Sequence, residues 1–201
     1  ERAQDLEHAL ADTGDLGHLR VGATLTIGNY LVVKMIADFR EAFPRADIEL
    51  SVANTETIAE QVARYELDVG MIEGELRHPD LEIQHWREDE LVVFAAPGHP
   101  FAALAELTDE HLKNIPWVIR EQGSGTRQAF DRAMTGILPS LDISLELQHT
   151  EAIKRAVEAG LGIGCLSRIS LFDAFRRGSL VPLKIPHRNF HRHFSIVLHR
   201  D

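Results

Sequence analysis

The stretch HLRVGATLTIGNYLVVKMIADFREAFPRADIELSV, residues 18–52, decides the fold. It begins with a short apolar strand over 18–23. Over 27–42, apolar residues then recur every three to four positions, which predicts an amphipathic helix. Pro44 ends that helix, and alternating apolar and polar residues predict a strand over 47–53. A strand–helix–strand unit with such short connections predicts a right-handed crossover and a parallel sheet.

The same alternation of strand and helix continues along the chain. The sequence Thr57-Ile58-Ala59-Glu60 has the form of a capping box and predicts a helix over 57–66, followed by a buried strand over 69–72. The apolar run 91–96 leads into Pro97-Gly98-His99-Pro100, which is typical of a joint between two lobes. Further strands are predicted over 117–119, 143–147, 161–166, 181–183 and 194–198, and helices over 109–113, 126–135, 150–159 and 168–177. The pattern predicts an α/β protein with two lobes.

Composition limits the classes of protein to which the chain can belong. Of 201 residues, 44% are hydrophobic and 26% charged, a globular composition that excludes a disordered or collagen-like chain. The net charge of −10 repels nucleic-acid phosphates, so we do not expect this chain to bind DNA itself. With one cysteine and no long apolar stretch, we expect neither a disulfide nor a membrane span. We therefore expect a cytoplasmic protein.

The strongest local signal for a site is the loop Glu121-Gln122-Gly123-Ser124-Gly125-Thr126-Arg127, which follows a strand and opens a helix. Its glycines allow a ligand to approach the backbone, Ser124 and Thr126 carry hydroxyls, and free amides at a helix start favour an anion. Arg127 in the first helical turn opposes the helix dipole unless an anion lies nearby. The alternative is that Arg127 pairs with Asp131 or Glu121. We interpret the loop, Gly125 included, as an anion-binding element.

Three further turns between a strand and a helix carry polar residues. The carboxyl ends of strands in open α/β sheets are where ligands bind, so these turns are expected to converge on one site. Each threonine could instead simply cap a helix. Glu73, after the third strand, either accepts a ligand hydrogen bond or caps a loop. The additional candidates are Thr24, Thr26, Asn54, Thr55, Glu73, His149 and Thr150.

The sequence offers no catalytic set. Gly123-Ser124-Gly125 lacks the flanks of a nucleophile elbow, and the glycines of 160–164 do not have dinucleotide-binding spacing. Cys165 lies in an apolar strand, as inert core thiols do. A metal site among His187, His191 and His193 is a weaker alternative to solvated histidines. We predict that the chain is not an enzyme and holds no metal and no cofactor.

The sequence resembles the effector-binding domain of LysR-type transcriptional regulators over nearly its whole length. The segments that carry the resemblance are GATLTIGNYL (22–31), FREAFP (39–44), LDVGMIEG (67–74), DELVVFAAPGHP (89–100), EAIK (151–154) and VEAGLGIG (157–164). The loop Gly123–Arg127 is similar to the branch that contains regulators of sulphur metabolism and of Calvin-cycle carbon fixation. The effectors of that branch are small anions.

This resemblance implies the type-2 periplasmic-binding-protein fold, with two Rossmann-like lobes. Lobe I would comprise 19–94 plus 168–201, and lobe II 95–167. Residues 1–17 would be the end of a linker helix, and the winged helix-turn-helix that binds DNA would not be part of this chain. The resemblance also implies homodimers, with antiparallel protomers side by side, that assemble into tetramers in the full-length regulator.

The function implied is a sensor in which a small anionic effector enters the cleft between the lobes and controls DNA binding by the missing domain. By position, the family's effector contacts correspond here to Thr24, Thr26, Asn54, Thr55, Ser124, Thr126, Arg127, His149 and Thr150. The alternative function is a periplasmic-type solute-binding protein for a small oxyanion, which shares the fold and the cleft. No membrane partner is expected.

Overall fold

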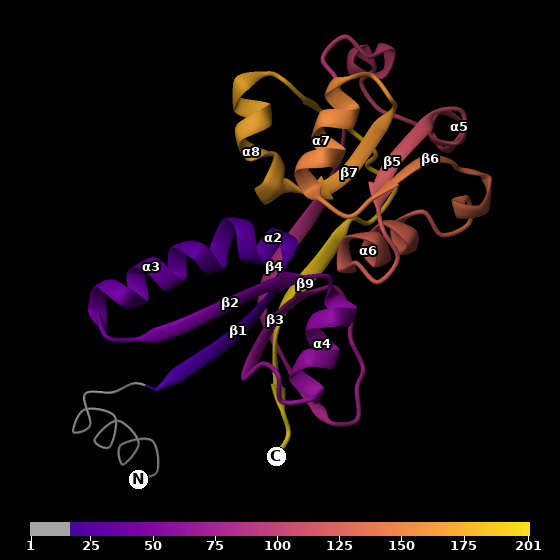
Figure 1. Cartoon of the computed structure of the whole chain (residues 1–201). Helices are drawn as coiled ribbons and strands as arrows, with labels where there is room; N and C mark the ends of the chain where they lie inside the picture. The colour runs from indigo at the N-terminus through magenta and orange to yellow at the C-terminus, as the bar shows by residue number, and fades with distance from the viewer. Residues whose placement is uncertain (1–16) are drawn as a thin grey trace.

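The computed structural model describes residues 17–201, which form two α/β lobes joined by two long strands (Figure 1). The linker helix expected over 1–17 lies outside the described residues, apart from Gly17. Among the described residues, no helix is long and apolar enough to cross a membrane.

Lobe I is built around three parallel strands, with β1 between β2 and β3. The helix expected over 27–42 begins two residues earlier, at Leu25, and contains one π-helical turn. The elements are β1 (His18–Thr24), α2 (Leu25–Ile27), η1 (Gly28–Val32), α3 (Val33–Ala42), β2 (Asp47–Ala53), α4 (Thr55–Ala63) and β3 (Val69–Glu73).

The start of α4 corrects one prediction. The prediction that a capping box starts the helix at Thr57 is wrong, because the helix already begins at Thr55. Asn54 is the N-cap, and its side-chain oxygen accepts a hydrogen bond of 3.0 Å from the Thr57 amide. Asparagine is as good a cap as threonine, so the local pattern alone did not decide between the two starts.

The two strands β4 (Leu81–Ala95) and β9 (His191–His199) pair antiparallel and run between the lobes. The sheet order is β2-β1-β3-β9-β4-β7-β5-β6, with β8 on β4. β4 is far longer than the strand predicted over 91–96, because its first half is half-exposed and lacks a continuous apolar run. In Figure 1, β4 and β9 pass through the middle of the molecule, between the lobes.

Lobe II repeats the parallel arrangement, with β5 between β6 and β7. Its strands are β5 (Pro116–Arg120), β6 (Asp142–Leu147), β7 (Ile163–Ser167) and β8 (Val181–Leu183). Its helices are η2 (Pro100–Ala103), α5 (Asp109–Lys113), α6 (Gly125–Ala133), η3 (Leu138–Ser140), α7 (Thr150–Glu158) and α8 (Arg168–Arg177).

The packing of α8 differs from the lobe boundary expected from the sequence. Leu171 and Ala174 of α8 lie in one hydrophobic cluster with Val118 of β5 and Val157 of α7. α8 therefore packs with lobe II, whereas residues 168–201 were expected in lobe I. β9 returns to lobe I, where Phe194 and Val197 join its hydrophobic clusters, and Ile169 near the start of α8 packs against the same lobe.

Candidate functional site

A cleft of about 500 Å³ lies where the carboxyl ends of the strands of both lobes meet. Its walls come from the start of α2 and the turn before α4 in lobe I, and from the ends of β5 and β6 in lobe II. Helices therefore begin at its edge, and the positive ends of their dipoles favour an anion. The amides of Thr26 and Thr57 are bonded to Glu73 and Asn54, whereas the start of α7 has no side-chain cap. The lining residues are Leu25, Asn29, Val52, Ala53, Asn54, Thr57, Glu121, Gln148 and His149.

Next to this cleft, Glu73 at the end of β3 is the centre of a buried polar network. Its carboxylate accepts hydrogen bonds from the Thr26 amide at 2.8 Å and from the Thr126 hydroxyl at 3.0 Å. Arg192 of β9 donates to the same carboxylate at 2.8 Å and to Asp89 of β4 at 2.6 Å. All of these side chains are buried. The network therefore joins β3 and β9 to the first turn of α6, in the other lobe.

The charges in this network keep Glu73 ionised. Burial alone would raise the pKa of Glu73, but the Arg192 guanidinium and the hydrogen bond from Thr26 outweigh burial and lower it to about 2. Glu73 is thus a carboxylate whose hydrogen-bonding capacity is used within the protein. Of the two roles expected for Glu73, a structural hydrogen-bonding role fits this arrangement better than a direct contact with a ligand.

A second contact between the lobes brings two backbones together. The Thr55 hydroxyl donates to the Glu73 carbonyl at 2.9 Å and accepts from the Gly125 amide at 3.2 Å. A Cβ atom at Gly125 would lie 2.0 Å from the Glu73 carbonyl oxygen. Glycine is therefore required at 125 for the lobes to approach this closely.

The predicted hydroxyls differ in whether they still have a proton to donate. A hydroxyl has one donor, and Thr126 and Thr55 already use theirs on Glu73. The oxygens of Thr24 and Thr150 are buried and have no hydrogen-bond partner among the described residues. Each is next in sequence to a residue that lines the cleft, Leu25 or His149. Thr24 and Thr150 are therefore the hydroxyls best suited to a ligand. Arg192 Nη2 is also buried and unpartnered among the described residues, but Arg192 does not line the cleft.

Ser124 lies at a second pocket of about 540 Å³, between α4 and α6. Its oxygen caps α6 by accepting hydrogen bonds from the amides of Thr126 and Arg127. The second pocket is rimmed by carboxylates, those of Glu56, Glu60, Glu75 and Asp131. Three of these four are paired with arginines, Glu60 with Arg64, Glu75 with Arg132 and Asp131 with Arg127, as Glu121 of the cleft is with Arg120. Among the described residues, the second pocket still has four lining carboxylates and the cleft one, so the second pocket is the less favourable place for an anion.

Arg127 is not the unpaired cation that the anion-binding interpretation requires. Its guanidinium contacts Asp131 at 2.8 Å and Glu146 at 2.5 Å, and donates to the Arg120 carbonyl at 3.1 Å. The alternative stated from the sequence, a pair with Asp131, is the arrangement observed. The two carboxylates remove the conflict with the helix dipole without any ligand.

The remaining candidates lie at the mouth of the cleft. Asn54 uses its side-chain oxygen to cap α4, and His149 precedes α7 with an exposed side chain that makes no capping hydrogen bond. Beside them, a third set of hydrogen bonds connects the two lobes. The Tyr30 hydroxyl of η1 donates to Glu151 at 2.8 Å and accepts from Lys154 of α7 at 3.3 Å.

Arg192 and Asp89 were not predicted from the sequence. Arg192 lies in the segment HRHFSIVLH, which reads as an exposed basic tail. The alternation of side chains along a strand could have shown that Arg192 is buried. Arg192 is two positions from Phe194 and therefore lies on the same buried face of the strand. Charged residues at buried positions of a strand need partners, and Asp89 is directly opposite Arg192 in the β4–β9 ladder.

Comparisons with known proteins identify relatives of this chain. The family model described as "LysR substrate binding domain" matches residues 12–201. The uncharacterized HTH-type transcriptional regulator YeiE of Escherichia coli K12 is 40% identical over 201 residues, which are 100% of this chain and 68% of that protein. The HTH-type transcriptional activator CmpR of Synechocystis is 33% identical over 98% of this chain and 65% of its own length. CysL of Bacillus subtilis is 34% identical over 76% of this chain and 51% of its own length.

Solved structures show the same fold. The CcmR regulatory domain of Synechocystis, in complex with 2-PG, aligns with a TM-score of 0.82 at 28% identity and covers 92% of this chain and 88% of that one. The cofactor-binding domain of the Cbl transcriptional regulator aligns with a TM-score of 0.81 at 27% identity, over 93% of this chain and 83% of that one. The predicted family resemblance and the two-lobed type-2 periplasmic-binding-protein fold are confirmed.

Proposed function

The chain belongs to the LysR substrate-binding domain family, and from that premise we propose that it is a sensor for a small anionic metabolite. The effector would occupy the cleft between the lobes and change the lobe arrangement. The observation that carries this proposal is the pair of buried hydroxyls, Thr24 and Thr150, that have no partner among the described residues. Buried polar groups are nearly always hydrogen-bonded, so such a pair beside a cleft fits a ligand.

The two hydroxyls belong to different lobes. Thr24 ends β1 and precedes α2, whereas Thr150 is the first residue of α7. A ligand that accepts from both would link the lobes at a point where hydrogen bonds already connect them. It would shift the balance between lobe arrangements by its difference in affinity for them.

An oxyanion suits this cleft because most of the polar side chains around it, Glu121 excepted, can donate hydrogen bonds. The two hydroxyls and the first-turn amides of α7, which no side chain caps, would hold it, since no lysine or arginine is among the residues that line the cleft in the described chain. This set of neutral donors favours compact anions with several oxygens, such as sulphur oxyanions, phosphate or a phosphorylated acid. The 2-PG complex of the related CcmR domain supports the same class and provides the first probe.

In the full regulator, this sensing would control DNA binding by a separate N-terminal domain, in the cytoplasm and without catalysis. The named relatives are transcriptional regulators of which this chain spans 51% to 68%. The surface also supports the expected homodimer. Val33, Met35 and Phe39 of α3 and Phe172 of α8 are exposed, and both helices lie on the same side of the molecule (Figure 1). Antiparallel protomers would place α3 of one against α8 of the other, and tetramers would form at full length.

Calorimetric titration of the domain with 2-PG, sulfate, sulfite, thiosulfate and phosphate tests the proposal. We expect saturable binding of at least one anion. Thr24→Val and Thr150→Val should each weaken it by about tenfold or more, the loss expected for a hydrogen bond to a charged group. Valine keeps the shape of threonine, so the comparison isolates the hydroxyl.

Two matched variants localise the binding. Thr135→Val removes a hydroxyl that donates to the Arg132 carbonyl outside the cleft, and it should leave the affinity unchanged. Ser124→Ala removes the hydroxyl at the acidic second pocket. An anion whose affinity falls in Ser124→Ala but not in the Thr24 and Thr150 variants would contradict the proposed cleft.

A further inference from the structure

A group of metal-ligating side chains lies outside the cleft, on the outer face of the β4–β9 ladder. His85 Nε2 and His193 Nδ1 are 2.8 Å apart, and Glu88 reaches both imidazoles, at 3.4 and 3.0 Å. One ligand atom from each of the three residues lies within 4.8 Å of the others. We propose that these residues form a site for a divalent transition metal ion such as Zn²⁺ or Ni²⁺.

The backbone brings the three side chains to one face through an irregularity in β4. Glu88 is directly opposite His193 in the ladder. His85 and Glu88 differ in parity and would point to opposite faces of a regular strand. The register shifts between His85 and Arg87, so Trp86 is an extra residue and His85 is opposite Ser195, on the His193 side. β-bulges often serve to redirect a side chain in this way.

The chemistry of the group fits a borderline metal. Two imidazoles and one carboxylate are a ligand set used for zinc, with a fourth position open to water. The side chains of His85, Glu88 and His193 are 53%, 65% and 51% exposed, so an ion can reach them from solvent. Their strands are fixed by the antiparallel ladder, which limits the ordering needed when an ion binds.

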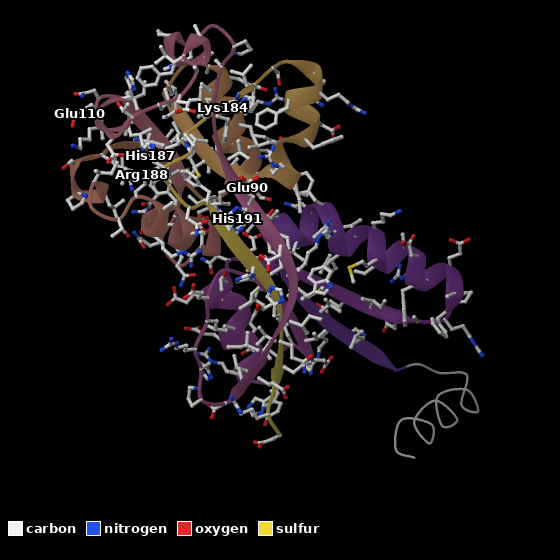
Figure 2. The ribbon with its side chains drawn as sticks, turned by 180° about the vertical axis from the view of Figure 1, so that it is seen from behind. Glu90, Glu110, Lys184, His187, Arg188 and His191 are labelled. Carbon is white, nitrogen blue, oxygen red and sulfur yellow. The ribbon has the colours of Figure 1, made fainter. Side chains whose placement is uncertain are left out.

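His187 and His191, the other two histidines considered from the sequence, are not part of this group. His187 contacts Asp109 at 2.8 Å. His191 is opposite Glu90 in the ladder, and Figure 2 labels both residues. Glu90 is paired with Arg168 at 2.7 Å. The proposed site therefore differs from the set of three histidines considered from the sequence, and the proposal departs from our expectation of no metal. Sequence spacing alone could not place His85 beside His193.

Titration calorimetry with ZnCl₂ and, separately, NiCl₂ tests the site on chelator-treated domain without a polyhistidine tag. We expect one saturable equivalent per chain and a higher melting temperature with the metal than without it. His85→Ala, His193→Ala and Glu88→Gln should each weaken binding at least tenfold, the lower end of the loss seen when even outer-shell partners are removed. His191→Ala, which removes an exposed histidine from the same face, is the matched control and should bind like the wild type.

The melting temperature of each variant without metal separates loss of ligands from loss of fold. If His193→Ala melts early, Glu88→Gln decides the question, because glutamine keeps the size of an exposed side chain. Metal binding of equal strength in the wild type and in all three variants would overturn the proposal. The same holds if no saturable binding of either ion is measured.

Discussion

Arg192 has the carboxylates of Glu73 and Asp89 at 2.8 and 2.6 Å, and all three side chains are almost completely buried. Such a group is costly to break, because removing one partner leaves an uncompensated charge in the interior. Glu73 in turn fixes the backbone of Thr26 and the hydroxyl of Thr126. Arg192, Glu73 and Asp89 therefore fix the backbone beside the cleft. The ligand contacts in our proposal are made by Thr24 and Thr150.

The lowered pKa of Glu73 predicts how stability depends on pH. The folded-state pKa is about 2, below the ordinary 4.5. The stabilisation that ionised Glu73 provides is therefore complete above about pH 5 and is lost as the pH falls from about 5 to about 2. Replacing Glu73 by Gln should reduce the free energy of unfolding at pH 7 by about 3 kcal/mol. Urea unfolding at pH 7 and pH 3 measures this.

The difference in the free energy of unfolding between the wild type and Glu73→Gln should be smaller at pH 3 than at pH 7. Asp109 also has a lowered pKa, about 2, because Arg188 and His187 hydrogen-bond to it. Protonation of Asp109 therefore also lowers the stability of the wild type in acid. Because Asp109 is present in both proteins, the difference between their free energies of unfolding reports on Glu73. A gap of equal size at both pH values would show that Glu73 is not held ionised by Arg192.

The two unpartnered threonines predict opposite effects on stability and binding. Thr24→Val and Thr150→Val each remove a buried hydroxyl that has no partner among the described residues. Thermal unfolding without ligand should show unchanged or slightly raised melting temperatures, although anion affinity falls. A marked loss of stability in both variants would indicate that these hydroxyls serve the fold.

At single residues, the sequence predicted which turns lie together but not the role of each side chain. The turns that carry Thr24, Thr26, Thr55 and Thr126 do lie around Glu73. Their partners come from segments far away in the chain, so no local pattern could tell which hydroxyls retain a proton. Arg127 illustrates the same point, because Glu146, its second partner, is on β6.

At the level of elements, α4 depends on Asn54. Replacing Asn54 by Ala removes the N-cap acceptor of the Thr57 amide and should cost about 1 kcal/mol in urea unfolding. Asn54→Asp keeps the capping oxygen and should retain the stability. If the Ala variant is as stable as the wild type, the cap assigned to Asn54 is not significant.

The contact between β3 and the start of α6 depends on Gly125. In Gly125→Ala the new methyl group would lie 2.0 Å from the Glu73 carbonyl oxygen, so the lobes must separate there. We expect a loss of about 1–3 kcal/mol in the free energy of unfolding. Gly98→Ala, where no atom lies within 4 Å of the new Cβ, is the control and should be neutral. Equal stability of the two variants would contradict the close approach.

Element boundaries were predictable where the signals were local. The helix over 168–177 and the strand over 47–53 match the structure. The sequence did not reveal the full length of β4 or its bulge at Trp86, because both depend on pairing with β9, about 110 residues later in the chain. Likewise, α8 shares one hydrophobic cluster with β4, β5, α7 and β7, an arrangement that no sequence periodicity records.

For the whole molecule, the exposed apolar residues of α3 predict self-association. Phe39 and Met35 are 39% and 44% exposed, and contiguous apolar surface of this kind marks an interaction site. Sedimentation velocity should show a dimer for the wild-type domain and a monomer for Phe39→Asp. Leu104→Asp changes an equally exposed leucine of lobe II and should remain dimeric. A Phe39→Asp variant that sediments like the wild type would exclude α3 from the interface.

The two-lobed fold was predictable from the order of elements and from the family resemblance, because both are properties of the whole chain. The cleft itself follows from that fold. The choice between the two pockets did not follow from it, since it depends on carboxylates from α4 and α6 that meet only in three dimensions.

The most direct test of the central claim is where an anion binds. Amide chemical shifts of the ¹⁵N-labelled domain, followed by NMR during titration with 2-PG and then with each sulphur oxyanion, locate it residue by residue. We predict saturable shifts centred on Thr24–Thr26 and His149–Thr150, at the starts of α2 and α7. Shifts centred instead on Glu56, Glu60 and Gln128 at the acidic pocket would contradict the account, as would no saturable shift with any of these anions.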